Sequence, residues 1–192
     1  MSLFSKEKNL KLNVGCGNRK IHGFINVDIR EDVNPDAVCD ISKISDTFKD
    51  VDLIYACHVL EHFPEKSFAF CKATWHDVLV DWHKSLKKGG TIRLSVPDME
   101  SVCQRYVKTG NLDEVKALFF GGQKYDYDYH FFGWDFLTLK TALEKIGFSN
   151  IRTYDWKTVE HHYIDDYSQA YLPHMDKMNG QLMSLNVEAT KS

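Results

Sequence analysis

Residues 12–28 read LNVGCGNRKIHGFINVD, a glycine-bearing turn between two apolar runs, the second of which ends in an acid. Gly15 and Gly17 have no Cβ, so the backbone of this turn can approach a ligand closely. Asp28, at the end of the second run, can accept hydrogen bonds from ribose hydroxyls. An apolar strand, a Gly-x-Gly turn and a strand-terminal acid therefore predict a parallel α/β sheet that holds an adenosine-type ligand.

The overall composition is that of one globular domain, because 192 residues suit a single well-buried core. A net charge of -3, with basic and acidic residues interspersed, disfavours a nucleic-acid partner held mainly through phosphate contacts. The five cysteines are odd in number and include no Cys-x-x-Cys pair, so neither a disulfide framework nor a thiol zinc site is predicted. Residues 1–8 contain no apolar signal core, and no run approaches the roughly twenty apolar residues of a membrane span. We expect a cytoplasmic protein with no membrane contact.

Hydrophobic patterning predicts an alternation of strands and helices along the chain. Short apolar or alternating runs bounded by turn residues predict strands at 10–14, 24–28, 36–40, 52–56, 91–96, 150–156 and 181–190. Apolar residues at helical spacing, together with capping and stop signals, predict helices at 74–86, 99–108, 112–120 and 136–146. Asn111 and Asp135 are the expected N-caps of the last two.

Two stretches lack such a period. Residues 121–134 combine glycines, acids and aromatic residues, and they are predicted to form a long loop or a small hairpin. Residues 157–180 are too many for a plain turn, and loops of that size are usually functional, interfacial or disordered. An interfacial role would make this second stretch a route to oligomer formation.

The order of the motifs resembles the class I S-adenosylmethionine-dependent methyltransferases, and in particular small methyltransferase-domain proteins. The motifs that carry the resemblance are Gly-Cys-Gly at 15–17, His-x-Leu-Glu-His at 58–62, Leu-Lys-x-Gly-Gly at 86–90 and Pro-Asp at 97–98. It implies an α/β, Rossmann-like sheet of seven mostly parallel strands, with helices on both faces. The last strand would be antiparallel and lie between the fifth and the sixth. A single domain, 1–192, would then comprise a cofactor half at about 10–98 and a substrate or lid half at about 99–192.

The connection after the glycine turn departs from that family pattern. Only a handful of residues separate Gly17 from Phe24, whereas a crossover helix between parallel strands needs about a dozen. The first helix is therefore predicted to shrink to about one turn, at 18–22, and residues 29–35 leave no room for a full helix either. The adenosine side of the pocket must then be more open or be covered by another segment.

The resemblance implies S-adenosylmethionine as cofactor and S-adenosylhomocysteine as product. The residues it assigns to the cofactor are Val14, Gly15, Cys16, Gly17, Asp28, Ile29, Asp40, Ile41, Cys57 and His58. Asp28 would hold the ribose hydroxyls, and Asp40 would face the adenine amino group between Ile29 and Ile41. Asp40 equally suits a cap on the short following helix, and His58 equally suits a helix-cap role.

Catalysis of methyl transfer is mainly a matter of positioning, and a base is required only for a hydroxyl or a protonated amine. The resemblance makes His62 and His130 candidates for that base, and His130 is preferred because its loop is expected to cover the carboxyl edge of the sheet. Asp98 would orient the base or bind acceptor hydroxyls. A purely structural role remains open for each of these side chains.

No metal site is predicted. His58 and His62 share a helical face, but Val59 follows the first histidine where a zinc-protease helix has its glutamate. The stretch 160–166 contains histidines and acids without the spacing of a zinc site.

Methyl transfer to a small-molecule acceptor is the function that these features favour, and a sugar hydroxyl is an acceptor compatible with the aromatic loop. One alternative is a non-catalytic scaffold that keeps an S-adenosylmethionine or nucleotide pocket. The other is an NAD-dependent oxidoreductase, which Lys20 disfavours because it occupies the position of the third glycine.

Overall fold

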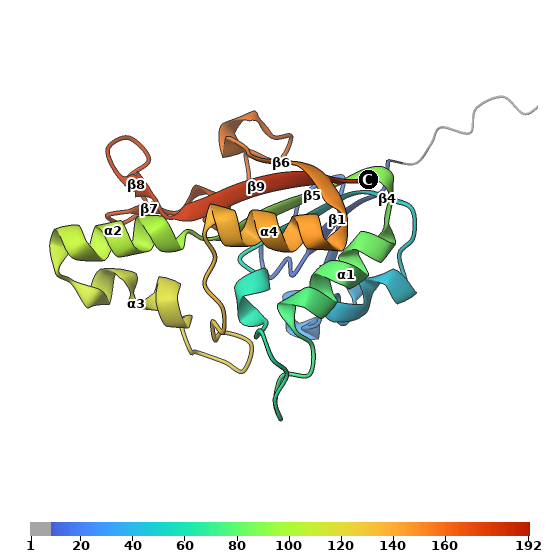
Figure 1. The fold of residues 1–192 in the computed structure, drawn as a ribbon, viewed down its shortest axis with the longest axis horizontal. Helices are drawn as coiled ribbons and strands as arrows, with labels where there is room; N and C mark the ends of the chain where they lie inside the picture. Colours follow the sequence, from blue (N-terminus) through green and yellow to red (C-terminus); the bar gives the residue numbers. More distant parts are fainter. Residues whose placement is uncertain (1–8) are drawn as a thin grey trace, which may run out of the picture.

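The computed structural model describes residues 9–192, so the expectation for residues 1–8 lies outside the described residues. One seven-stranded sheet has the order β3-β2-β1-β4-β5-β9-β6 (Figure 1). The last strand, β9, runs antiparallel to both of its neighbours, whereas β1 to β5 pair in parallel. The predicted sheet, with its antiparallel last strand between the fifth and sixth, is confirmed.

The strands lie close to their predicted positions. They are β1 (Lys11–Val14), β2 (Ile25–Asp28), β3 (Ala37–Val38), β4 (Val51–Cys57), β5 (Leu86–Pro97), β6 (Phe148–Thr153) and β9 (Ser184–Lys191). The strand predicted at 181–190 is divided, because Met183 turns into a separate apolar cluster beside the helices at this end of the sheet. The residues before it form β8 (Gln181–Leu182), which pairs with β7 (Tyr171–Leu172) in a two-stranded sheet.

All four predicted α-helices are present, and polar caps define their starts. They are α1 (Trp75–Ser85), α2 (Met99–Thr109), α3 (Leu112–Phe120) and α4 (Phe136–Ile146). Thr74 and Asp77 form a reciprocal capping box on α1. Asn111 and Asp135 accept hydrogen bonds from the first turns of α3 and α4, as the sequence predicted.

The sheet has two differently covered faces, and the alternation along β4 separates them. Ile54 and Ala56 point into the main core, which also contains Trp82 of α1 and Leu143 of α4. Figure 1 shows both helices on that one side of the sheet.

The second face is covered by the segment 157–170 and not by α-helices, so the prediction of helices on both faces is wrong for this face. The helical turn predicted at 18–22 is absent, and the connection after β2 contains only the 3-10 helix η1 (Glu31–Val33), so neither connection supplies an α-helix to this face. Leu53 and Tyr55 pack there with Ile164, and the ring of His161 lies 4.1 Å from that of Tyr55. The two alternatives for the adenosine side of the pocket, more open or covered by another segment, concern a different surface and stay predictions.

Buried polar contacts anchor this segment to the sheet. Tyr55 Oη donates to Asp166 Oδ2 over 2.7 Å, and the other oxygen of Asp166 accepts from the backbone and hydroxyl of Ser168 at the start of η5 (Tyr167–Gln169). Asn186 of β9 donates to the Ser168 carbonyl over 2.9 Å. The segment is therefore held on the second face by hydrogen bonds as well as by apolar contact.

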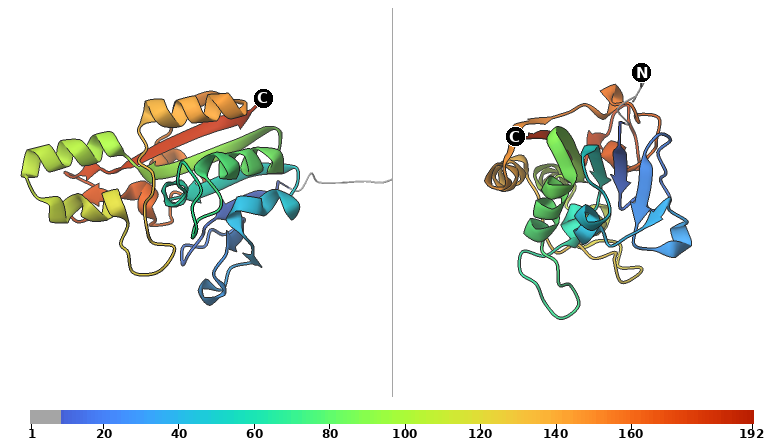
Figure 2. Two further views of the ribbon diagram at one scale, coloured as in Figure 1. Left: turned by 60° about the horizontal axis from the view of Figure 1, so that its bottom comes forward. Right: turned by 90° about the vertical axis from the view of Figure 1, so that its right-hand side faces the viewer.

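The carboxyl end of the sheet is extended by a small second layer. There α2 and α3 run out beyond the strands, as Figure 2 shows, and pack on the β7–β8 hairpin through Val102, Val115 and Met183. Among residues 9–192, none of the helices is long and apolar enough to cross a membrane.

Replacing Tyr55 with phenylalanine tests the anchor of the second face. Tyr55→Phe leaves Asp166 Oδ2 buried without its donor, so we expect the free energy of unfolding to fall by about 1–3 kcal/mol in urea denaturation. Tyr163→Phe, which alters a side chain of the same segment that is 56% exposed, is the control and should stay within about 0.5 kcal/mol of wild type. Equal stability of the two variants would contradict the anchoring role.

Candidate functional site

The glycine turn after β1 is left-handed at both glycines. Gly15 has φ +67° and Gly17 has φ +49°, conformations that other residues rarely adopt. A Cβ on Gly15 would lie 2.5 Å from Cγ2 of Val59, so this glycine makes room for the chain that follows β4. The sequence predicted instead that Gly15 makes room for a ligand.

Asp28 lies next to this turn at the end of β2. Its carboxylate is buried, and Oδ2 accepts a 2.8 Å hydrogen bond from the Gly17 N–H. Oδ1 accepts a 2.9 Å bond from the backbone N–H of Arg30. A carboxylate has about four acceptor positions, so two remain for a ligand.

Two buried asparagines replace the missing crossover helix. Asn13 Nδ2 donates to Asn26 Oδ1 over 2.9 Å and to the Arg19 carbonyl over 2.8 Å. Asn26 in turn donates from its backbone and side chain to Asp36. This network ties β1, the short connection and β2 together, and so sets the position of Asp28. The signal that sequence reasoning missed was an asparagine at the centre of each apolar strand.

The residues that the resemblance assigns to the adenine follow β2 and β3. Asp40 caps η2 (Ile41–Asp46), and both the backbone and the hydroxyl of Ser42 donate to its Oδ1. The capping role left open by the sequence is therefore present. Ile29 is half-exposed, and Ile41 packs against the main core.

Cys57 is the last residue of β4, and the chain turns sharply at His58. Burial raises the pKa of the Cys57 thiol well above its usual range. His58 has a left-handed φ of +51°, and its Nε2 lies 2.9 Å from Ser184 Oγ. Because that hydroxyl donates to the Tyr167 carbonyl, it accepts from the His58 N–H. Burial lowers the pKa of His58 to about 3, so the ring is neutral.

Glu61 is a candidate site residue that the sequence prediction missed, although the His-x-Leu-Glu-His motif contains it. It lies in the 3-10 helix η3 (Leu60–His62) and is 1% exposed. Among the described residues neither of its carboxylate oxygens has a hydrogen-bond partner. Burial raises the pKa of Glu61 to about 8, and its own backbone N–H opposes this only in part.

The two predicted bases meet beside this carboxylate. The rings of His62 and His130 are 4.9 Å apart, and His130 Nε2 lies 3.9 Å from Glu61 Oε1. Burial lowers the pKa of His130 to about 4 and also lowers that of His62. Asp98, the third predicted catalytic residue, caps α2. Its carboxylate accepts hydrogen bonds from the Glu100 N–H and the Ser101 hydroxyl.

Comparison with known proteins identifies the fold. No family model and no curated protein matches the sequence. Among solved structures, a SAM-dependent methyltransferase from Archaeoglobus fulgidus is 18% identical with a TM-score of 0.56, over 97% of this chain and 87% of its own. A second SAM-dependent methyltransferase, from Methanosarcina mazei, is 13% identical with a TM-score of 0.57. The match covers 100% of this chain and 99% of that one. Human N-acetylserotonin methyltransferase in complex with SAM is 14% identical with a TM-score of 0.57. The match covers 96% of this chain and 48% of that one.

These similarities, together with the strand order, establish the architecture. The chain has the class I S-adenosylmethionine-dependent methyltransferase fold. In a sheet of this kind ligands bind outside the carboxyl ends of the strands. The glycine turn, Asp28 and the histidine cluster all lie at that edge of the methyltransferase fold.

A lid loop, residues 121–134, is hydrogen-bonded to η3 within this methyltransferase fold. The N–H groups of Phe131 and Phe132 donate to the Glu61 carbonyl over 2.8 and 3.3 Å. The His62 ring nitrogen Nδ1 lies 2.9 Å from the Tyr129 carbonyl. The predicted loop at these positions is confirmed, and these bonds place His130 beside His62.

The far end of the lid loop reaches Arg30, which follows β2. The Asp128 carboxylate orders it by accepting from the N–H groups of Gly122 and Lys124. The guanidinium carbon of Arg30 lies 5.0 Å from the ring centre of Tyr125, within the range of a cation–π contact. The loop therefore spans from the histidine cluster to the residue beside Asp28.

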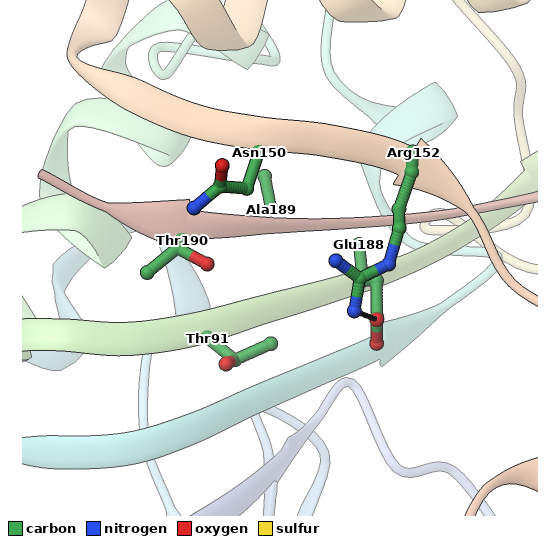
Figure 3. A pocket seen from close by; sticks show the side chains of 6 residues that line it. All are labelled: Thr91, Asn150, Arg152, Glu188, Ala189 and Thr190. Carbon is green, nitrogen blue, oxygen red and sulfur yellow. Dashed lines mark hydrogen bonds and ion pairs between the residues drawn. The ribbon is translucent and has the colours of Figure 1, made fainter.

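The hollow drawn in Figure 3 is not part of this site. It lies between β5, β9 and β6 and is lined by Thr91, Asn150, Arg152, Glu188, Ala189 and Thr190. Its volume of about 30 Å³ matches a single water molecule. Thr91 begins the regular pairing of β5 with β9, so the hollow lies far from the carboxyl edge.

Removing the Tyr125 ring tests the attachment of the lid loop. Tyr125→Ala removes a contact of about 0.5–2 kcal/mol, so opening should increase about 2- to 30-fold, measured by hydrogen exchange at the Gln123 and Asp128 amides. Tyr125→Phe keeps the ring and should exchange like wild type. Tyr127→Ala, at a side chain that is 56% exposed, is the matched control. Unchanged exchange in Tyr125→Ala would show that the contact does not hold the loop.

Proposed function

We propose that this chain is a methyltransferase that uses S-adenosylmethionine and acts on a small-molecule acceptor. The observation that carries the proposal is the direct hydrogen bond between the Gly17 N–H and the Asp28 carboxylate, at the carboxyl edge of a sheet with the methyltransferase strand order. It joins the turn that can approach a cofactor to the acid that can hold its ribose. A structural neighbour in complex with SAM lends further support.

The cofactor would lie across the turn and the ends of β2, β3 and β4. Residues 14–17 would face its methionine portion, and the free acceptor positions of Asp28 would bind the ribose hydroxyls. Asp40 uses only Oδ1 for its cap, so Oδ2 remains for the adenine amino group between Ile29 and Ile41. Cys57 and His58 would line the methionine end.

The acceptor would approach from the side of the lid loop. His130 Nδ1 lies 3.0 Å from the Leu118 carbonyl and donates to it, which leaves Nε2 with a lone pair for an acceptor proton. The Tyr129 carbonyl orients the His62 ring in the same way, because it accepts a hydrogen bond from Nδ1. Asp98 would bind a more distant hydroxyl of the acceptor.

A sugar hydroxyl is the acceptor that we propose within this class. The lid loop exposes the rings of Tyr127, Tyr129 and Phe131 beside the histidines, and aromatic faces of this kind pack on apolar ring surfaces while their hydroxyls hydrogen-bond. The five free thiols fit a cytoplasmic location. Tyr163 and Tyr167 remain exposed on the 157–180 segment, and any oligomer would use that surface.

Calorimetric titration with S-adenosylhomocysteine tests the cofactor assignment. Wild type should bind it, and Asp28→Ala should weaken binding at least tenfold because two charge-assisted hydrogen bonds to ribose are lost. Asp32→Ala, at an exposed acid in the same connection, is the control and should bind like wild type. Absence of binding to the intact protein would overturn the proposal, and binding of NADH in its place would indicate the oxidoreductase.

Methyl transfer to a panel of sugars and phenols separates the enzyme from a non-catalytic scaffold. The proposed enzyme should turn over at least one hydroxyl acceptor, and His130→Gln should reduce kcat by about 100-fold or more, as expected for a group that manages the acceptor proton. The affinity for S-adenosylhomocysteine should stay unchanged in that variant. Tight cofactor binding without turnover of any acceptor would favour the scaffold.

A further inference from the structure

The carboxylate of Glu61 poses a physical problem that the proposed methyl transfer alone does not solve. It is 1% exposed, and neither of its oxygens has a hydrogen-bond partner among the described residues. Burying a carboxylate without a donor or a cation costs several kcal/mol. Buried groups of this kind are normally paired or bound to a metal ion.

The side chains that face Glu61 offer lone pairs and not protons. His130 donates from Nδ1 to the Leu118 carbonyl, so the Nε2 atom, 3.9 Å from Glu61 Oε1, has a lone pair. His58 donates from Nε2 to Ser184, so its Nδ1, 3.4 Å from the same oxygen, also has a lone pair. These acceptors converge on a carboxyl group that has one proton to donate when neutral and none when ionised, so a cation is the partner that could satisfy all of them at once.

His62 completes the arrangement. Its Nδ1 lies 2.9 Å from the Tyr129 carbonyl and donates to it, which leaves Nε2 available. A backbone carbonyl on the far nitrogen is how metal-binding histidines are usually oriented. Both His62 and His130 have such a partner, and both partners belong to the chain from α3 through the lid loop.

We propose that Glu61, His62 and His130 bind a divalent transition-metal cation, with His58 available as a fourth ligand. One ligand atom from each of the three residues lies within 4.8 Å of the other two. Ligands of one such ion lie about 2.0–2.2 Å from it and hence about 3.0–3.5 Å apart, so binding would draw η3 and the lid loop together by about 1 Å.

The choice of ion follows from the ligand atoms. Imidazole nitrogen suits zinc, iron, cobalt and nickel, whereas magnesium and calcium prefer sets composed of oxygen. Two imidazoles and one carboxylate leave open positions on the ion for water or an acceptor oxygen.

The position of the cluster suggests what such an ion would do. Val59, between His58 and η3, packs against Gly15, so the cluster lies beside the turn proposed to hold the methionine end of the cofactor. With the cation bound, the Nε2 lone pair of His130 is a metal ligand and no longer accepts the acceptor proton. An acceptor hydroxyl on the cation would instead lose its proton to water, because the cation lowers the hydroxyl pKa. The oxygen would then form the O–CH3 bond while the C–S bond breaks and its electron pair stays on sulfur. This consequence rests on the proposed function, whereas the metal site does not.

Titration of Co²⁺ into the full-length, chelator-treated protein tests the site without cofactor or acceptor. The visible absorption of the bound ion should appear and saturate at one ion per chain. Glu61→Gln, His62→Ala and His130→Ala should each weaken binding by about 10–100-fold or more, since even indirect support of a ligand has that effect. His22→Ala, at an exposed histidine outside the cluster, should bind Co²⁺ like wild type.

The outcomes separate the site from the proposed function. Absence of saturable Co²⁺ absorption, or equal affinity in wild type and Glu61→Gln, would overturn the metal site. Co²⁺ binding in a protein that fails to bind S-adenosylhomocysteine would support the site and reject the methyltransferase. The affinity of each variant for S-adenosylhomocysteine shows whether that variant is folded. A variant that binds S-adenosylhomocysteine like wild type but binds Co²⁺ more weakly supports the proposal. A variant whose affinities for S-adenosylhomocysteine and for Co²⁺ are both unchanged contradicts it.

Discussion

The contact between Val59 and the Cβ-less Gly15 is the constraint on which the candidate site depends. A side chain at position 15 would meet Val59 at 2.5 Å and would also have to adopt a φ of +67°. Either effect alone favours glycine. The contact brings the start of η3 against the turn after β1, and so places Glu61 and His62 beside the glycine turn. The cofactor side and the histidine cluster therefore depend on one packing interaction.

The two acids of the site have opposite environments although both are buried. Asp28 accepts from two backbone N–H groups and lies close to Arg30, so its charge is balanced where a ribose would bind. Glu61 has no such donor and faces imidazole lone pairs. Because burial disfavours the charged form, the pKa of Glu61 rises to about 8. Both side chains are largely hidden from water, so what separates the two sites is the set of hydrogen-bond partners.

A methyltransferase sheet is maintained here with much less helix than usual. The second face, which short crossovers leave bare, is covered by a segment that follows β6, far along the chain. Its contacts are specific, with Tyr55 bound to Asp166 and Asn186 bound to Ser168. Buried hydrogen bonds of this kind determine one position for a segment that has little regular structure. The asparagine pair at Asn13 and Asn26 performs the same task for the short connection between β1 and β2.

Local sequence determined the elements of this protein, because period, caps and turn residues act over a few positions. The glycine turn, the caps Asn111 and Asp135 and the short connection after Gly17 were all readable, and the resemblance supplied the strand order. Tertiary structure alone decided how distant segments meet. The lid loop brings His130 to His62, and the segment 157–170 covers the second face. The isolation of Glu61 also depends on tertiary structure, because a carboxylate lacks a donor only after every surrounding segment has packed against it.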